Sequence, residues 1–499
     1  LWYNFSMTRS LVIGAGLGGL AAALRLRAKG DEVEVLERLP SAGGRAQVFE
    51  KNGFKHDAGP TVITAPFLFD ELFSLFGEKR QDYLEFKPLD LWYRFYFDST
   101  GDTFDYTASI EKTKEEISRF NKEDVEGYDR LINTSEKIFN IGFSELADKP
   151  FTKFSSMLKQ IPSLLKLKSY LSVSQLVNSH IKHPQIRQAF SIHPLLVGGN
   201  PFDTTSIYAL IHYLERKWGV FFCMGGTGKL IKELESLMIR QDISIRFNTD
   251  VEQILVKNGR STGVVTSSGE IISSNRIVCN ADTPAVYDEL LSAQPKRRKK
   301  AVPEKFTRYS MGLYVLFFGT NTKYKKVAHH TIWMGKRYRA LLSDIFNAKI
   351  LTDDFSLYLH RPTATDPSFA PDGCDSFYVL CPVPNLQGNV NWDVQGPALQ
   401  ERIINALNRT IMPNLKETIV DPFWMSPREF KTNYRAKHGA GFSIAPIFAQ
   451  SAWFRYHNKD PHINNLFFTG AGTHPGAGMP GVLCSAKVVE NLIAEEQVK

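Results

Sequence analysis

Short apolar runs next to glycine-rich turns stand near both ends of the chain. Residues 10–13 and 465–469 are such runs, and both predict strands buried inside a sheet. Each run is followed by a glycine loop and then by a stretch typical of a helix, at residues 20–29 and 482–495. This repeated order of strand, loop and helix predicts an α/β domain with a doubly wound parallel sheet.

The middle of the chain has a different pattern. Residues 312–319, 355–360 and 376–381 are rich in aromatic and β-branched residues, which favours strands of a mixed sheet in a substrate domain. Residues 136–223 instead predict a helical region, within which Pro150 and Pro162 separate short helices. The sequence therefore predicts a second sheet and a helical region beside the α/β domain.

The first glycine loop has the spacing of a dinucleotide-binding motif. Gly14 makes the tight turn after the strand, Gly16 lets the backbone approach a pyrophosphate, and Gly19 lets the following helix pack closely on the strand. The amino terminus of that helix then faces the phosphates. Glu37 ends the second strand, where its carboxylate can accept hydrogen bonds from both hydroxyls of an adenosine ribose and repels the extra phosphate of NADP.

Further turns follow where a simple NAD-binding domain would begin its next helix. Residues 40–45 contain a Gly-Gly-Arg turn, and residues 57–61 form a second turn that allows close approach of a ligand. Another glycine loop, residues 470–481, precedes the last helix. The residues that these loops offer to a cofactor are Gly43, Gly44, Arg45, Gly59, Pro60, Thr61, Gly470, Gly472, Met479, Gly481 and Val482.

The Gly-Gly-Arg turn resembles that of a flavoprotein superfamily that includes monoamine oxidases, protoporphyrinogen oxidase and carotenoid desaturases. The resemblance implies that this turn lies against the flavin side of FAD and that Val251 lies beside the adenine. The helix amino terminus after the last glycine loop would then stabilise the negative charge of a reduced flavin. FAD is long enough to need both glycine loops, which explains their separation in the sequence.

Four longer motifs resemble bacterial phytoene desaturases: residues 57–64, 195–202, 450–455 and 470–478. The resemblance extends from about Met7 to the end of the chain. It implies desaturation of phytoene through partly desaturated carotenoids toward lycopene, with loose, peripheral attachment to the cytoplasmic side of a membrane. Quinone or oxygen is the expected electron acceptor, because the sequence has no evident arginine clamp for NADP.

Two kinds of alternative stay open. One is a related enzyme, such as a carotenoid isomerase, a ketolase or a desaturase of shorter isoprenoids. The other is a non-catalytic isoprenoid-binding protein with the fold of the GDP dissociation inhibitors. Intact glycines on the flavin side speak against the second alternative.

The resemblance also divides the chain into regions. The FAD-binding domain is discontinuous and comprises residues 7–70, 224–290 and 455–499, while residues 71–135 and 291–454 form the substrate domain. Residues 136–223 form the helical region expected to contact the membrane. Within it, residues 151–183 mix lysines with apolar residues, as membrane-surface helices do, although a solvated helical cap has the same pattern. The basic cluster at residues 296–300 is interpreted as a solvated loop.

Composition narrows the range of partners. The formal net charge of +8 suits an anionic membrane or a phosphate-bearing cofactor. The sequence contains no recognisable zinc or nucleic-acid motif, so we predict neither a metal site nor nucleic-acid binding. The sequence contains no run of about eighteen apolar residues, so we expect no helix that spans a membrane. The five cysteines are widely spread, which indicates reduced thiols.

The sequence does not identify a catalytic acid or base. Desaturation removes a hydride, which a flavin accepts and no side chain does. His474 lies within the last glycine loop and is a candidate for proton transfer, although a hydrogen bond that shapes the loop explains it equally well. Arg455 and Lys487 have the same two interpretations, so we assign no catalytic residue from the sequence.

Overall fold

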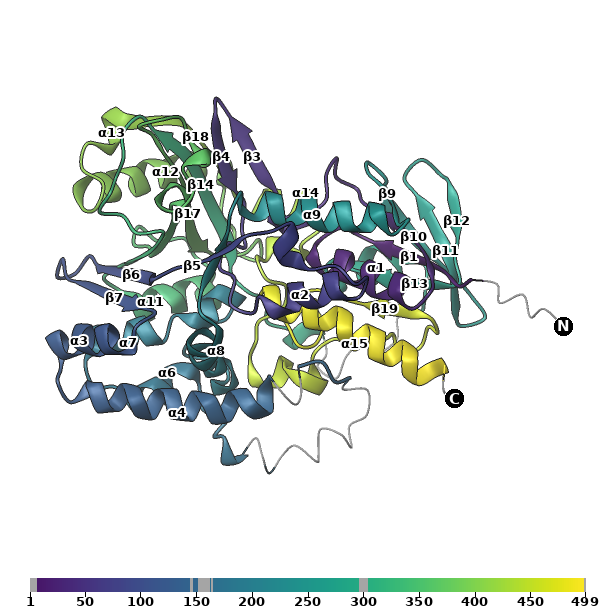
Figure 1. Cartoon of the computed structure of the whole chain (residues 1–499), viewed down its shortest axis with the longest axis horizontal. Helices are drawn as coiled ribbons and strands as arrows, with labels where there is room; N and C mark the ends of the chain where they lie inside the picture. Colours follow the sequence, from purple (N-terminus) through teal and green to yellow (C-terminus); the bar gives the residue numbers. More distant parts are fainter. Residues whose placement is uncertain (1–6, 144–146, 151–161, 163–164, 296–303, 498–499) are drawn as a thin grey trace.

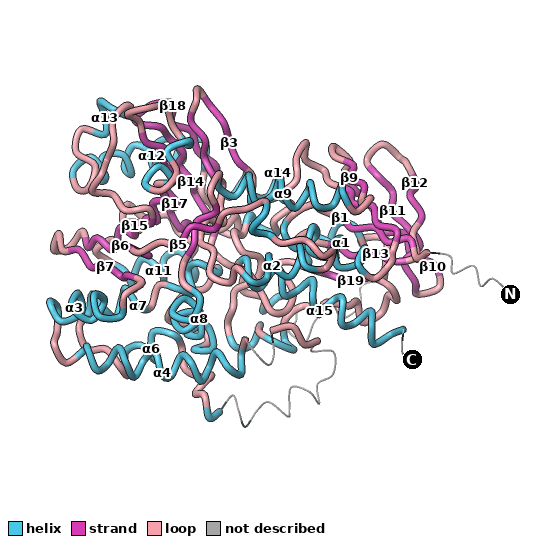
Figure 2. The backbone as a smooth tube through the Cα atoms, in the orientation of Figure 1, coloured by secondary structure: helices cyan, strands magenta, loops and turns pink. Residues whose placement is uncertain are grey.

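The computed structural model describes residues 7–143, 147–150, 162, 165–295 and 304–497. The chain forms two lobes side by side (Figure 1). The α/β lobe contains a five-stranded sheet and the two ends of the described chain. The other lobe, which we call the sheet–helix lobe, combines a seven-stranded sheet with a group of helices (Figure 2).

A parallel sheet forms the centre of the α/β lobe. In spatial order its strands are β19 (Leu466–Phe468), β13 (Arg276–Cys279), β1 (Arg9–Ile13), β2 (Glu32–Leu36) and β9 (Ser244–Arg246). The beginning, the middle and the end of the chain all contribute strands. This arrangement confirms the predicted α/β fold with a doubly wound sheet.

The central strand β1 is covered on both faces. Val12 packs in one cluster with helices α1 (Leu17–Ala28), α9 (Gly226–Arg240) and α15 (Met479–Gln497), and α2 (Phe67–Ser74) joins the same cluster. Leu11 and Ile13 point to the other face, as alternation along a strand requires. That face packs against the sheet of β10 (Val251–Lys257), β11 (Arg260–Thr266) and β12 (Ile271–Ser273).

Two helices begin earlier than the sequence indicates. Helix α1 begins at Leu17, whereas the predicted stretch began at residue 20, and α15 begins at Met479, whereas Pro480 or Gly481 was expected to open it. Gly18 and Gly19 therefore belong to α1 itself, and Pro480 lies in the first turn of α15. Proline is tolerated there because the first amides of a helix have no partner within it.

The sheet–helix lobe is built on a mixed sheet. Its strands, in spatial order, are β18 (Ile419–Met425), β14 (Gly312–Thr320), β17 (Asp375–Val383), β16 (Leu357–His360), β15 (His330–Met334), β6 (Leu91–Phe97) and β7 (Thr103–Thr107). Strands β15 and β6 run parallel and the other neighbours antiparallel, which confirms the predicted mixed sheet. Helix α12 (Trp392–Arg409) covers one face, and α11 (Tyr338–Ser343) and α14 (Pro427–Tyr434) lie on the other.

Helices fill the rest of this lobe beside β6 and β7. They are α3 (Ile110–Phe120), α4 (Asp124–Gly142), α6 (Val173–Asn178), α7 (Pro184–Phe190) and α8 (Leu210–Trp218). An aromatic core joins most of them to the strands. The short elements that remain are the strand pairs β3 (Val48–Lys51) with β4 (Phe54–Asp57) and β5 (Phe86–Pro88) with β8 (Phe221–Cys223), and the helices α10 (Thr283–Ala285) and α13 (Leu415–Thr418).

Several sequence predictions stay predictions. Residues 151–161 and 163–164, at the centre of the expected membrane contact, lie outside the described residues, as does the basic cluster at 296–300. The domain boundaries also stay predictions. Among the helices that the structure describes, none has the length and apolar character needed to cross a membrane.

The five cysteines are all free thiols, and four of them are buried. Burial raises the pKa of Cys223, Cys279, Cys381 and Cys484 to about 12. These four thiols are therefore protonated and unreactive at neutral pH.

The close packing of α1 on β1 leads to a prediction about the stability of the protein. A Cβ atom at Gly19 would lie 1.9 Å from the carbonyl oxygen of Gly14, which is a backbone atom that cannot move aside. We expect Gly19→Ala to lower the free energy of unfolding by about 3 kcal/mol in a chemical denaturation curve. Gly142→Ala is the control, because a Cβ there would meet only flexible side-chain ends at 3.3 Å and beyond. Equal stability of the two variants would contradict the packing role of Gly19.

Candidate functional site

One cavity of about 550 Å³ receives residues from both lobes. Its first part, the loop part, is lined by the glycine loops that follow β1, β2 and β19 and by residues after β13. Its second part, the apolar arm, is lined by side chains of the seven-stranded sheet and of neighbouring helices. The cavity therefore begins where open α/β sheets bind their ligands, at the carboxyl ends of the parallel strands.

Nearly all residues that the sequence singled out lie on the wall of this cavity. They are Gly14, Gly16, Glu37, Gly43, Gly44, Arg45, Gly59, Pro60, Thr61, Val251, Gly470, Gly472, Met479, Gly481 and Val482. Gly19 does not line the cavity and instead packs against Gly14, which is the role that the sequence pattern indicates for it. Their contacts with individual parts of a cofactor stay predictions.

Backbone amides hold the Glu37 carboxylate at the end of β2. The amide of Ala15 donates to Glu37 Oε2 over 2.6 Å, and the amide of Leu39 donates to Oε1 over 2.8 Å. Burial raises the pKa of Glu37, whereas these hydrogen bonds lower it. The carboxylate is therefore fixed in orientation, and the two oxygens keep lone pairs for a ligand's hydroxyl groups.

Asn280, directly after β13, fits between the glycine loops. A Cβ atom at Gly16 would lie 2.7 Å from Asn280 Nδ2, and one at Gly18 would lie 2.5 Å from Asn280 Oδ1. At Gly470 the same oxygen would be 3.0 Å away. The glycines thus leave space for one polar side chain, which lies between the first and the last glycine loop. Sequence reasoning missed Asn280, and its only signal was its position directly after the apolar run at residues 277–279.

Two residues of opposite charge, Arg45 and Asp282, line the loop part. Arg45 and Asp282 both line the cavity, and the charge of Arg45 favours the ionised form of Asp282 while burial raises the pKa of that carboxyl. The amide of Lys437 donates to Asp282 Oδ2 over 2.8 Å. Arg45 thus has a fixed electrostatic partner, and its guanidinium is available on the cavity wall. Asp282, like Asn280, was missed by sequence reasoning.

Arg455 has a structural position beneath the last glycine loop. Its buried guanidinium donates to the carbonyl oxygens of Thr473 and Ala471, over 3.0 and 2.5 Å, and to those of Ile444 and Gln450, over 3.2 and 3.3 Å. Burial lowers the pKa of Arg455. The residue therefore fixes the loop between β19 and α15 and is a positioning residue.

His474 and Lys487, the other two residues without an assigned role, differ in their position relative to the cavity. His474 lines the cavity, and its carbonyl oxygen accepts a hydrogen bond from Asn458 Nδ2 over 2.9 Å. Lys487 instead forms ion pairs with Glu71 at 3.2 Å and Asp148 at 3.5 Å, away from the cavity wall. His474 thus stays a candidate for chemistry at the site, whereas the contacts of Lys487 are those of a structural ion pair.

The apolar arm is a long hydrophobic surface that continues from the loop part. Its wall includes Leu313, Ile332, Tyr358 and Leu380 from four strands and Leu214 and Leu341 from α8 and α11. Alternation along the strands places these side chains on the face opposite to α12. The arm can therefore hold an elongated apolar molecule with one portion next to the loop part.

A few polar groups interrupt the apolar wall. The Glu215 carboxylate lines the arm and is buried, with the hydroxyl of Tyr93 donating to it over 2.7 Å and His193 Nε2 lying 3.0 Å away. Thr61 and Tyr358 also line the cavity, and their hydroxyl oxygens are 2.9 Å apart. Sequence reasoning missed Glu215, because a glutamate within a helix has the pattern of a solvated residue.

Comparison with known proteins identifies the family. Residues 17–489 match the family described as flavin containing amine oxidoreductase. A phytoene desaturase (lycopene-forming) of Pseudescherichia vulneris is 45% identical over 492 residues, covering 98% of this chain and 100% of that relative. The chain belongs to the phytoene desaturase family. A phytoene desaturase (lycopene-forming) of Pantoea ananas is 44% identical over 493 residues, covering 99% and 100%.

A solved structure extends the fold comparison. An oxidoreductase from Methanosarcina mazei has a TM-score of 0.68 with this chain at 17% identity, covering 97% of this chain and 100% of the other. At that identity the likeness concerns the fold. It agrees with the α/β lobe and mixed sheet described above.

The loop part fits FAD, the cofactor of this flavoprotein family. Gly16, Gly18 and Gly470 line the cavity at the end of the sheet, and Glu37 presents a fixed carboxylate there. Arg45 and the amino terminus of α15 add positive charge to the same wall. This phytoene desaturase family member is thus an FAD-dependent oxidoreductase.

Glu37 offers a direct test of the cofactor site. We expect Glu37→Gln to raise the dissociation constant of FAD by roughly 10- to 100-fold, because hydrogen bonds to a charged group contribute about 1.5–3 kcal/mol. Titration of the FAD-free protein, followed by flavin fluorescence, measures this change. Glu34→Gln on the same strand is the matched control, since Glu34 does not line the cavity and pairs with Arg9 at 3.0 Å. Equal affinities of the two variants would remove Glu37 from the site.

Proposed function

We propose that this FAD-dependent oxidoreductase desaturates phytoene in successive steps toward lycopene. The observation that carries the proposal is the single cavity in which the glycine-lined loop part opens into the apolar arm. The substrate named for the curated relatives of 44% and 45% identity supports the same conclusion. A hydrocarbon that lies in the arm would reach the flavin end of the cofactor without leaving the apolar surroundings.

Each new double bond requires removal of a hydride and a proton from adjacent carbons. FAD, when bound, supplies the acceptor for the hydride. The chain itself supplies the hydrophobic wall, which holds the hydrocarbon extended and excludes water from the reacting carbons. Glu215 is the buried carboxylate that this wall offers for the released proton, and Tyr93 and His193 orient it. A quinone or oxygen then takes the electrons.

Anaerobic spectroscopy tests the reaction. FAD-loaded protein is mixed with liposomes that contain phytoene, and the expected result is bleaching of the flavin absorbance together with new polyene bands. Chromatography of the products then distinguishes lycopene from partly desaturated carotenoids, isomers and oxygenated carotenoids. A flavin that stays oxidised with phytoene unchanged would contradict the proposal and favour a non-catalytic isoprenoid-binding protein or another substrate.

A charged side chain in the apolar arm tests whether the substrate lies there. We expect Leu380→Lys to reduce polyene formation at least tenfold while the protein keeps its FAD, because an isolated charge in an apolar cavity disfavours a hydrocarbon ligand. Leu386→Lys is the control, since Leu386 is equally half-buried in the same lobe but does not line the cavity. Full activity of Leu380→Lys would show that the substrate lies elsewhere.

We further propose that phytoene enters from a membrane surface, on the cytoplasmic side, near residues 165–170. Leu167 lines the cavity, while Leu165 and Tyr170 beside it are 59% and 63% exposed. Phe448 also lines the cavity and is 43% exposed, so the wall reaches the molecular surface there. Large apolar side chains next to a cavity mouth are suited to contact with lipid.

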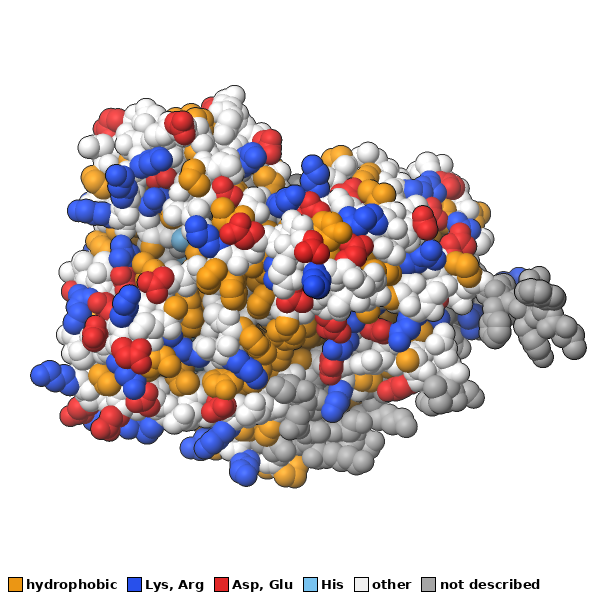
Figure 3. Space-filling view, viewed as in Figure 1, with side chains coloured by type: hydrophobic (Ala, Val, Ile, Leu, Met, Phe, Trp, Pro, Cys, Tyr) orange, Lys and Arg blue, Asp and Glu red, His pale blue; other side chains and the backbone are white. Residues whose placement is uncertain are grey.

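The charge and the surface pattern agree with this entry route. Lys166 and Lys168 are exposed between the apolar residues of the same segment, where anionic headgroups would attract them. Figure 3 shows hydrophobic side chains gathered along the furrow between the lobes, whereas charged residues of both signs are scattered over the rest of that face. Free, protonated thiols support the cytoplasmic side, where thiols stay reduced.

Sedimentation with liposomes tests the membrane contact. We expect the double variant Leu165→Asp and Tyr170→Asp to lower the fraction of protein bound to anionic liposomes at least fivefold, because two carboxylates would face anionic lipid. The matched control is Ile239→Asp with Ile271→Asp, at side chains that are 64% and 66% exposed elsewhere on the molecule. Equal binding of the two double variants would place the membrane contact outside residues 165–170.

A further inference from the structure

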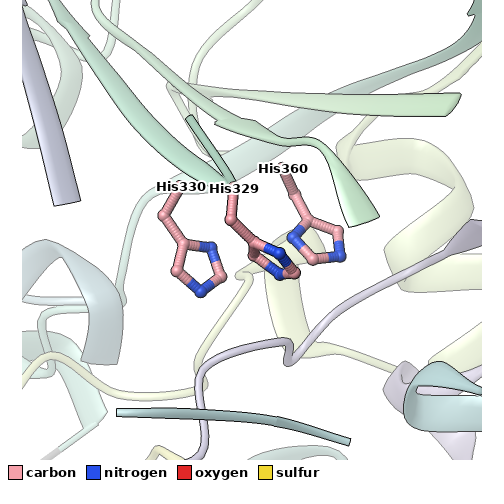
Figure 4. Close-up of side chains that lie close together, drawn as sticks. All are labelled: His329, His330 and His360. Carbon is pink, nitrogen blue, oxygen red and sulfur yellow. The ribbon is translucent and has the colours of Figure 1, made fainter. Parts of the chain in front are cut away.

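Three buried histidines lie beside one another outside the cavity wall. His330 is the first residue of β15 and His360 is the last residue of β16, and the two residues pair directly across these strands. His329 lies just before β15, in a bend that brings its ring next to the other two (Figure 4). Each histidine offers a ring nitrogen, and these three atoms lie within 4.8 Å of one another.

Several polar atoms of this cluster have no hydrogen-bond partner. They are Nε2 of His329, Nε2 of His330, both ring nitrogens of His360, and Oδ2 of Asp57. The Asp57 oxygen lies 3.6 Å from His360 Nε2, and its residue is only 1% exposed. Buried polar atoms without partners cost free energy, so three such histidines side by side, with Asp57 next to one of them, require an explanation.

The opposite side of two rings is already held in place. His329 Nδ1 lies 2.6 Å from the hydroxyl oxygen of Thr365, and His330 Nδ1 lies 2.7 Å from the hydroxyl oxygen of Tyr358. When Nδ1 donates its hydrogen to these oxygens, Nε2 carries a free lone pair. Histidines that bind metals have this arrangement, with the second ring nitrogen fixed by a hydrogen bond.

The surroundings keep the imidazoles neutral. Burial lowers the pKa of His360 to about 3 and the pKa of His329 and His330 well below its usual value. The ring of Phe222 packs against His329, with ring centroids 4.7 Å apart, and shields the cluster on that side. Neutral imidazole is the form that coordinates a metal.

We propose that His329, His330, His360 and Asp57 bind one divalent first-row transition cation, with zinc as the reference ion. Three imidazole nitrogens and one carboxylate oxygen form a ligand set that zinc accepts in tetrahedral geometry. Zinc–nitrogen bonds of about 2.0–2.1 Å place two ligand nitrogens roughly 3.3 Å apart. The rings therefore need to move inward by an ångström or so from their 4.8 Å limit, which side-chain rotation can provide.

The position of the cation would link parts of both lobes. His330 and His360 belong to the seven-stranded sheet and His329 directly precedes β15, whereas Asp57 is the last residue of β4 and contacts helix α9 of the α/β lobe. The amide of Thr227, in the first turn of α9, donates to Asp57 Oδ1 over 3.0 Å. A cation here would therefore tie the sheet to α9 through Asp57, so its role is structural and distinct from the desaturation proposed above.

Metal analysis of the FAD-loaded protein tests the site. The protein is made without a histidine tag, incubated with ZnCl2, dialysed, and analysed by plasma mass spectrometry. We expect about one equivalent of zinc per chain and an increase in the thermal unfolding midpoint that a strong chelator removes. Less than a tenth of an equivalent in the wild-type protein would overturn the proposal, independently of any variant.

Two variants locate the bound ion. His360→Gln is expected to lower the zinc content at least fivefold, because it removes one of the three imidazoles. His212→Gln is the matched control, since His212 is also fully buried with both ring nitrogens unpartnered but lies outside the cluster. Equal zinc in His360→Gln and His212→Gln would show that the ion binds elsewhere. Should His360→Gln fail to fold, the cobalt absorption spectrum of the wild-type protein decides between nitrogen-rich tetrahedral and other coordination.

Discussion

Helix α1 can lie against strand β1 only because Gly19 has no side chain, and the cofactor end of the molecule depends on this contact. A Cβ atom at Gly19 would be 1.9 Å from the Gly14 carbonyl oxygen. With α1 so close, Gly16 and Gly18 lie against Asn280 after β13, and the Gly43 amide donates to the Ala15 carbonyl oxygen over 2.8 Å. The same packing places the Ala15 amide within 2.6 Å of the Glu37 carboxylate.

The far end of the site depends on a buried positive charge. Arg455 donates to four backbone carbonyl oxygens, two of them in the loop between β19 and α15. Removing a guanidinium from water is costly, and these hydrogen bonds offset that cost. The loop is thereby fixed where its glycines and the start of α15 form the cavity wall. Segments hundreds of residues apart can then enclose one cofactor next to one apolar arm.

Local motifs made much of this site predictable. Gly14, Gly16, Gly19 and Glu37 carry their spacing and chemistry in a short stretch, and the strand patterns at 312–319 and 376–381 correspond to β14 and β17. Asn280 and Asp282 were not predictable, because their roles depend on contacts with distant segments. Glu215 looked like a solvated helix residue, and only the folded structure shows that Tyr93 and His193 surround it on the wall of the arm.

The histidine cluster illustrates the same limit. His329 and His330 are thirty residues from His360 and without the short spacing of a zinc motif, so the sequence predicted no metal site. Pairing of β15 with β16 brings His330 opposite His360, and Asp57 comes from the end of β4, far away in the sequence. Only the register of the sheet and the position of β4 beside it create the ligand set.

A crystal structure of the FAD-loaded protein with bound lycopene tests the central claim, that the cofactor site and the apolar arm form one cavity. The account predicts electron density for the polyene along the wall formed by Leu313, Ile332 and Leu380, with part of the chain in contact with the flavin ring. A flavin ring closed off from that wall, or a polyene bound at another surface, would contradict it.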